Sequence, residues 1–156
     1  MTPRYMLDTN IASYLLRGSH PQLEQRLRRE SVAAICISAV TRAELRYGVA
    51  RLLPAATRLE REVERFLQGI TVLPWEAAAA DAYGPVRAAL ERKGTPIGSL
   101  DTQIAAHALV ANLTIITHNS AEFRRVPGLR VEDWVAADRL YDTHIQSLRK
   151  EGQIHG

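Results

Sequence analysis

The sequence predicts an α/β fold, a three-layer α/β/α sandwich in which a mostly parallel sheet has about five strands. Two observations predict it. Short apolar segments alternate with longer segments of helical periodicity along most of the chain. A strand–helix–strand order of this kind produces parallel strands whose connecting helices cover both faces of the sheet. At 156 residues, the chain is long enough to bury the core of one such domain.

Five short apolar segments are the predicted strands. The second of them is β-branched and continuously apolar, which is typical of a strand buried on both faces. It also holds the single cysteine, Cys36, which we expect to be a small core residue. The predicted strands are 4–7, 33–37, 70–73, 114–117 and 129–131.

The segments between the strands have the apolar spacing of helices. Gly18 is placed to end the first helix, Pro54 ends the third, and Pro85 is expected to bend the fifth. The predicted helices are 9–17, 21–29, 38–53, 55–68, 77–93, 99–111 and 120–125.

The composition is that of a folded domain, with 46% hydrophobic and 24% charged residues. After Trp134 the chain becomes polar. We therefore expect a domain at 1–135 and a C-terminal extension at 136–156, partly helical or disordered, with a helix at 136–150. A signal-peptide pattern and a membrane-spanning stretch are both missing from the sequence, so a cytoplasmic location is predicted. The formal charge of +3 suits a polyanionic partner without requiring one.

Acidic side chains fall where the predicted strands end. Asp8 follows the first strand, Glu44 lies in the second turn of the helix after the second strand, and Asp101 opens a later helix. Asn119 follows the fourth strand. Active sites of open α/β sheets form beyond the carboxyl ends of their strands, so these four side chains are expected at one rim.

Each of these residues also has a purely structural explanation. Asp8 is placed to cap a helix, and Asp101 to complement the positive end of one. The segment 41–44 (TRAE) matches a capping box in which Glu44 reaches back to a backbone N–H. Asn119 fits an ordinary turn. These alternatives stay open at the level of sequence.

The three acids taken together favour a metal site. Carboxylates crowded at one rim repel each other, and the repulsion grows where water is excluded. A hard divalent cation such as Mg²⁺ or Mn²⁺ relieves it, because such ions prefer oxygen ligands. A metal held this way activates water and neutralises charge on a phosphodiester. We therefore predict that Asp8, Glu44 and Asp101 bind Mg²⁺ or Mn²⁺ for phosphodiester hydrolysis.

The histidines and arginines carry weaker indications. The five histidines lack metal-ligand spacing; His107 is expected to be a packing residue, and His118 is a weaker candidate for contacting substrate. Arginines near the rim, such as Arg17, Arg42 and Arg46, either contact phosphate or form a solvated helix face. The run 58–65 is expected to form i,i+4 ion pairs.

From about Tyr5 to Trp134 the sequence resembles a PIN domain, and specifically the VapC-type toxins of bacterial type II toxin–antitoxin pairs. The segments that carry the resemblance are 6–10 (MLDTN), 37–38 (IS), 44–48 (ELRYG), 101–108 (DTQIAAHA), 117–119 (THN) and 131–134 (VEDW).

The resemblance implies a PIN fold with a five-stranded parallel sheet, and an endoribonuclease whose metal-binding acids are Asp8, Glu44 and Asp101. It places Thr9, Asn10 and the pair Thr117 and Asn119 at the pocket edge, as residues that contact substrate or support the acids. Many PIN domains have a fourth acid where this chain has Asn119, which leaves the number of metals open.

Partners are also implied by the resemblance. They are an RNA substrate, a second copy of the chain in a homodimer, and a VapB antitoxin whose C-terminal segment occupies a groove and blocks the acids. The segment 93–98 (KGTPIG) resembles VapC proteins that cut the anticodon loop of initiator tRNA.

Two other functions are weighed against this one. The apolar-Asp8-Thr-Asn10 segment superficially resembles the start of small-molecule phosphatases with an aspartyl nucleophile, although these need a second Asp where this chain has Asn10. The other alternative is a non-catalytic RNA- or protein-binding module in which the acids act only as helix caps.

Overall fold

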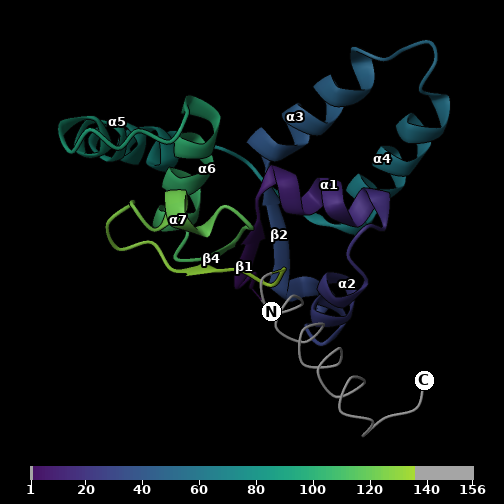
Figure 1. Cartoon of the computed structure of the whole chain (residues 1–156), viewed down its shortest axis with the longest axis horizontal. Coiled ribbons are helices and arrows are strands. Elements are labelled where there is room, and N and C mark those ends of the chain that lie inside the picture. Colours follow the sequence, from purple (N-terminus) through teal and green to yellow (C-terminus); the bar gives the residue numbers. More distant parts are fainter. Residues whose placement is uncertain (1, 136–156) are drawn as a thin grey trace, which may run out of the picture.

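Five parallel strands form the central sheet of the computed structural model, which describes residues 2–135 (Figure 1). The strand order is β3-β2-β1-β4-β5, so β1 lies in the middle with β2 and β4 on either side. This confirms the predicted fold class. The strands are β1 (Tyr5–Leu7), β2 (Ile35–Ser38), β3 (Thr71–Leu73), β4 (Thr114–Ile116) and β5 (Val131–Glu132).

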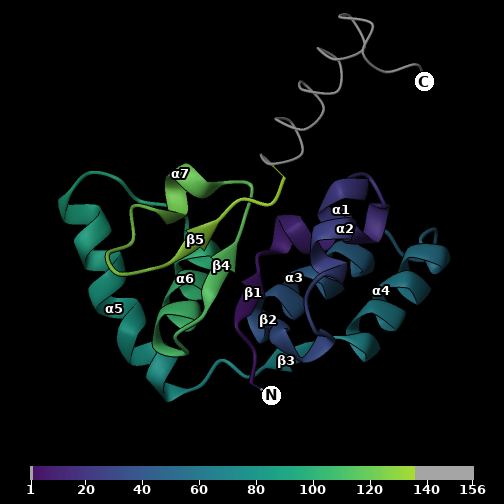
Figure 2. The same cartoon turned by 90° about the horizontal axis from the view of Figure 1, so that it is seen from below.

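Helices connect the strands and lie on both faces of the sheet. They are α1 (Thr9–Arg17), α2 (Pro21–Arg28), α3 (Ala39–Ala50), α4 (Thr57–Gly69), α5 (Ala77–Arg92), α6 (Ser99–Val110) and α7 (Ser120–Phe123), with a short 3₁₀ turn at Val32–Ala34. Figure 2 shows α1–α4 on one side of the strands and α5–α7 on the other.

Successive strand side chains enter two separate hydrophobic cores, because side chains alternate between the faces of a sheet. Leu7 and Ile37 pack with α1–α4, whereas Met6, Cys36 and Ile115 pack with α5–α7. All five are fully buried. Burial on both faces explains why the strand sequences are continuously apolar, and Cys36 is a core residue as expected.

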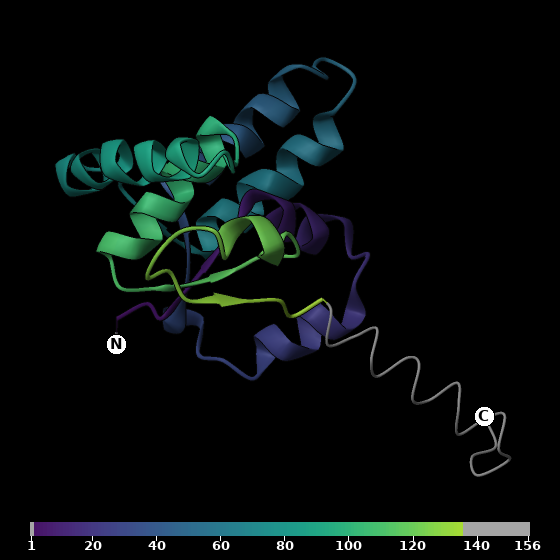
Figure 3. The same cartoon turned by 60° about the vertical axis from the view of Figure 1, so that its left-hand side comes forward.

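The structure differs from the predicted boundaries around Pro54. The long predicted helix 38–53 ends at Ala50, and residues 51–56 form turns before α4 begins at Thr57. Proline disfavours helical backbone in the residue before it, so the helix stops short of Leu53. In Figure 3, α3 and α4 form a hairpin that projects beyond the sheet.

Smaller differences affect strand ends. The second strand begins at Ile35 and not at residue 33, because 32–34 form the 3₁₀ turn, and the fifth begins at Val131 and not at 129. Gly18 ends α1 in the left-handed conformation, as predicted, and α5 continues through Pro85. The predicted helix at 136–150 and the predicted extension at 136–156 lie outside the described residues. Within residues 2–135, every helix is too short or too polar to cross a bilayer.

Within residues 2–135, Phe123 is the largest side chain that is fully buried, and it packs α7 against the second core. We predict that Phe123→Ala lowers the free energy of unfolding by about 3–5 kcal/mol, because it removes most of the ring and leaves a cavity. Urea unfolding followed by circular dichroism measures it. Val110→Ala, at a position 43% exposed, is the control and changes stability by less than about 0.5 kcal/mol. Equal effects of the two changes would contradict the assignment.

Candidate active site

Asp8 lies directly after β1 at the centre of the sheet and is 3% exposed. Its Oδ1 accepts a hydrogen bond from the backbone N–H of Ile11 at 2.8 Å, which makes Asp8 the N-cap of α1. Its Oδ2 accepts a hydrogen bond from the Thr117 hydroxyl at 2.6 Å, beyond the end of β4. The capping role considered from the sequence is therefore confirmed. It also fixes this carboxylate at the rim of the sheet.

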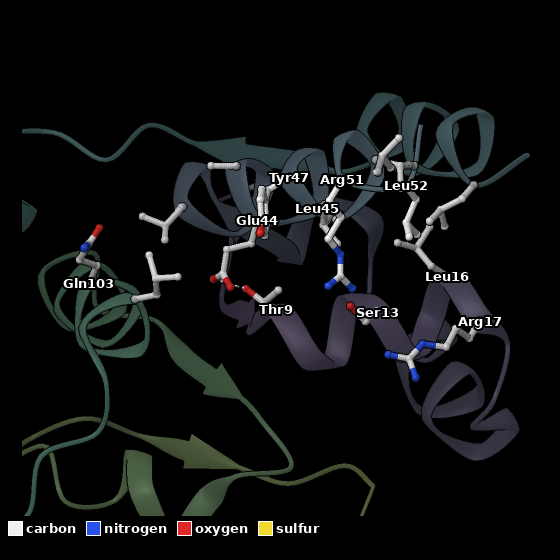
Figure 4. A pocket seen from close by; sticks show the side chains of 17 residues that line it. Thr9, Ser13, Leu16, Arg17, Glu44, Leu45, Tyr47, Arg51, Leu52 and Gln103 are labelled. Carbon is white, nitrogen blue, oxygen red and sulfur yellow. Dashed lines mark hydrogen bonds between the residues drawn. The ribbon is translucent and has the colours of Figure 1, made fainter. Parts of the chain in front are cut away.

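Glu44 lies in α3 and faces α1. Its Oε1 accepts a hydrogen bond from the Thr9 hydroxyl at 2.9 Å, which Figure 4 shows as a dashed line between the two helices. The capping-box explanation for segment 41–44 is wrong. Ser38 is the N-cap of α3 and its Oγ accepts from the backbone N–H of Val40, so Glu44 is not used to cap the helix.

Asp101 lies in the first turn of α6, the third residue after the N-cap Gly98. Gly98 has a φ of 64°, a left-handed conformation that favours glycine, and it turns the chain sharply into the helix. Glycine has no side chain with which to cap α6, and Asp101 supplies the acidic charge of its first turn.

The three acids line one cavity of about 350 Å³. Its walls come from the start of α1, from α3 and from the start of α6. Among the described residues, the lining contains three carboxylates and no Lys, Arg or His. The lining residues are Asp8, Thr9, Asn10, Glu44, Gly98, Ser99, Leu100 and Asp101.

The acids perturb one another because nothing in the cavity neutralises them. Burial raises the pKa of Asp101 to about 6, and the charges of Asp8, Glu44 and Glu122 add to the increase. The pKa of Asp8 is also raised, first by burial and then by Glu44 and Asp133, although its two hydrogen bonds oppose the change. The cavity is thus an electrostatically strained site that favours a cation or a proton.

The donor set fits a hard divalent cation. Carboxylate, hydroxyl and amide oxygens surround the cavity, and a cation would supply the missing positive charge. Within residues 2–135, however, the structure contains no group of three or more Asp, Glu, His or Cys side chains that are already close enough to hold a metal ion together. An ion such as Mg²⁺ keeps several of its waters when bound, so single carboxylates and waters would share its coordination.

The remaining predicted site residues lie around the acids. Thr9 and Asn10 line the cavity. Thr117 is fully buried, and besides donating to Asp8 it accepts from the backbone N–H of Asn119 at 2.9 Å. This contact places Asn119 beside the Asp8–Thr117 pair.

Three residues near the acids were not predicted to act there. Asp133 and Glu122 each raise the pKa of one acid, and Thr41 contacts the Thr9 hydroxyl at 3.1 Å. Asp133 follows β5, which pairs with β4, so strand pairing would have placed it at the same rim. Glu122 and Thr41 reach the site through helix packing, which spacing along the chain does not reveal.

Several weaker expectations are resolved. His107 is 5% exposed and its Nδ1 lies 2.8 Å from Ser38 Oγ, so it is a packing residue. His118 Nδ1 lies 3.1 Å from Asp133 Oδ2. Arg46 forms an ion pair with Glu64. The predicted pairing in the run 58–65 is confirmed by the i,i+4 bridge from Arg58 to Glu62.

Comparisons with known proteins identify the family. The PIN domain family model matches residues 5–129. The chain is 39% identical over 131 residues to the tRNA(fMet)-specific endonuclease VapC of Salmonella typhimurium, covering 84% of this chain and 98% of the relative. It is 36% identical over 135 residues to Ribonuclease VapC2 of Rickettsia felis, covering 83% and 97%.

Solved structures give the same result. The DNA-bound VapBC complex from Salmonella typhimurium matches with a TM-score of 0.80 and 38% identity, over 85% of this chain and 99% of that one. VapBC2 from Rickettsia felis, bound to a DNA fragment from its promoter, matches with a TM-score of 0.76 and 34% identity, over 83% and 98%.

The raised pKa of Asp101 predicts how stability depends on pH without metal. The folded state keeps the Asp101 proton up to about pH 6, whereas in the unfolded chain this pKa is near 3.8. Between these values the folded state binds the Asp101 proton more tightly, so the contribution of Asp101 to the free energy of unfolding decreases as the pH rises from about 4 to about 6. Asp101→Asn should weaken this dependence and raise the melting temperature at about pH 8.

Thermal unfolding in EDTA at several pH values measures the effect. Asp81→Asn, at an exposed aspartate of α5, is the matched control and should preserve the pH dependence of the wild type. A wild-type protein whose stability rose steadily from pH 4 to 6, with no difference in Asp101→Asn, would show that Asp101 is not strained.

Proposed function

The chain belongs to the PIN-domain family, and on that basis we propose that it is a divalent-metal-dependent endoribonuclease, the toxin of a toxin–antitoxin pair. Asp8, Glu44 and Asp101 bind Mg²⁺ or Mn²⁺ in this proposal. The observation that carries it is the cavity in which these three acids meet without a basic residue among the described residues that line it.

The chemistry follows from the cavity. When bound, the metal supplies a more acidic water and positive charge against the phosphodiester. Asp101 or Asp8 would accept a proton from the attacking water, as a carboxylate within reach of that water. Attack on phosphorus and cleavage of the bond to O3′ leave 3′-hydroxyl and 5′-phosphate ends. Thr117 holds Asp8 in place, and Asn10 and Asn119 contact the substrate at the edge.

The two alternative functions have less support. A phosphatase would use Asp8 as a nucleophile and would need a second Asp two residues later, where this chain has Asn10. A non-catalytic module would use the acids only as caps. Asp8 is a cap, but Glu44 and Asp101 make no capping hydrogen bond.

A groove adjoins the cavity. A groove of about 820 Å³ runs between α1, α3 and α4, with largely apolar walls and the guanidinium groups of Arg17 and Arg51 (Figure 4). It shares Thr9, Glu44 and Leu100 with the acid cavity. We propose that the C-terminal segment of a VapB-type antitoxin lies in this groove and covers the acids. The VapBC complexes among the similar structures support this.

We further propose a substrate, a cellular location and an oligomeric state. The relative named a tRNA(fMet)-specific endonuclease, together with segment 93–98, favours initiator tRNA cut in its anticodon loop. The chain is proposed to act in the cytoplasm as a homodimer. Mapping the 5′ ends of RNAs cut during brief expression identifies the substrate, and a small-molecule phosphatase would yield no such ends.

Loss of any of the three acids should abolish cleavage. We predict that Asp8→Asn, Glu44→Gln and Asp101→Asn each reduce the rate of RNA cleavage in Mg²⁺ or Mn²⁺ by at least about 100-fold, since even residues that only support metal ligands cost 10–100-fold. Cleavage of purified tRNA on denaturing gels measures it. Asp81→Asn is the matched control and should cleave like the wild type. Full activity in Asp101→Asn would refute the assignment.

A negative charge placed in the groove should weaken the binding of the antitoxin. Leu52 lines the groove and is 47% exposed. We predict that Leu52→Asp weakens antitoxin binding at least about tenfold, because a carboxylate would lose its water against apolar walls. Isothermal titration with the antitoxin measures the affinity. The control is Val110→Asp, at a position similarly exposed and outside the groove. Equal affinities for the two variants would place the antitoxin elsewhere.

A further inference from the structure

A chain of hydrogen bonds joins the protein core to the acid cavity. Thr41, in the first turn of α3, is fully buried, and its hydroxyl lies 3.1 Å from the Thr9 hydroxyl of α1. The Thr9 hydroxyl in turn lies 2.9 Å from Glu44 Oε1. Thr9 lines the cavity and Thr41 does not, so these hydrogen bonds connect the protein interior to the site.

The chemistry of the three groups sets the direction of these bonds. An ionised carboxylate only accepts, so the single hydroxyl proton of Thr9 is donated to Glu44. Thr9 then has only lone pairs left for Thr41. The Thr41 hydroxyl therefore donates to Thr9, and the Thr9 hydroxyl donates to Glu44.

Packing alone does not require a hydroxyl at position 41. Valine has nearly the same shape as threonine, and a buried hydroxyl is costly unless it is hydrogen-bonded. The bond that Thr41 makes to Thr9 satisfies it. Its effect is to hold the Thr9 proton toward Glu44, because a Thr41 that donates to the Thr9 oxygen excludes the alternative in which Thr9 donates to Thr41.

We infer that Thr41 is a positioning residue that orients Glu44 for the cation through the hydroxyl of Thr9. This inference rests on the proposed metal site. The hydrogen bond to Oε1 restrains the carboxylate and leaves Oε2 available to a cation or its water. Groups that hold metal ligands in this way contribute strongly to metal affinity.

Mn²⁺ binding to the full-length chain tests the inference. Electron paramagnetic resonance of unbound Mn²⁺ measures affinity without requiring RNA. We expect Thr41→Val to weaken Mn²⁺ binding about tenfold or more. Thr41→Ser keeps the hydroxyl and should bind close to the wild-type value. Thr114→Val is the control for loss of a threonine hydroxyl, since Thr114 lies at the amino end of β4, whereas the acids lie beyond the carboxyl ends of the strands. The Mn²⁺ affinity of this variant should not change.

Each outcome separates the inference from the function beneath it. Equal losses in Thr41→Val and Thr41→Ser would show that packing matters and not the hydroxyl, and would overturn the inference. If Thr41→Val bound Mn²⁺ as tightly as the wild type while Glu44→Gln bound it weakly, the inference would also be overturned. The proposed metal site would remain supported in that case. Unchanged affinity in Glu44→Gln itself would remove the metal site and the inference with it. Urea unfolding without Mn²⁺ confirms that each variant is folded.

Discussion

Repulsion among unneutralised carboxylates at the end of β1 is the constraint on which this structure depends. Asp8, Glu44 and Asp101 are brought to one cavity, where burial raises the pKa values of Asp8 and Asp101 and the charges of neighbouring acids add to the increase. Folding alone does not favour this arrangement, because ionised Asp8 and Asp101 are less stable there than in water. The two hydrophobic cores on either face of the sheet offset the cost. A cation that enters the cavity is therefore stabilised by these carboxylates.

The topology of the sheet determines where the carboxylates meet. From β1 the chain adds β2 and β3 on one side, then returns to add β4 and β5 on the other. Ligands in open α/β sheets bind where the strand order reverses, beyond the carboxyl ends. Asp8 lies at this point and is tied to both sides, to α1 through its Ile11 N–H and to the end of β4 through Thr117. The helices α3 and α6 then bring Glu44 and Asp101 from opposite faces of the sheet.

The sequence was sufficient to predict the fold class and the meeting of the three acids at one rim, because strand ends follow from local patterns, whereas the order of the strands was not predicted. Asp8 and Asp101 begin helices, so their position at the rim could be deduced from neighbouring residues alone. The role of Thr41 could not. Its TRAE segment satisfies a local capping rule, yet Ser38 caps the helix and Thr41 instead contacts α1. Such a contact depends on how two helices pack, and spacing within one helix does not contain it.

The groups that hold the acids are neutral, and this is consistent with a site built for a cation. Asp8 is fixed by a backbone N–H and a hydroxyl, and Glu44 by the Thr9 hydroxyl. An Arg or Lys would fix a carboxylate more strongly, but it would also neutralise it and remove the attraction for a metal. Hydroxyl and amide donors supply the orientation and leave most of the negative charge in place. A protein that needed these acids only for stability would gain from a basic partner, and none lines the cavity within residues 2–135.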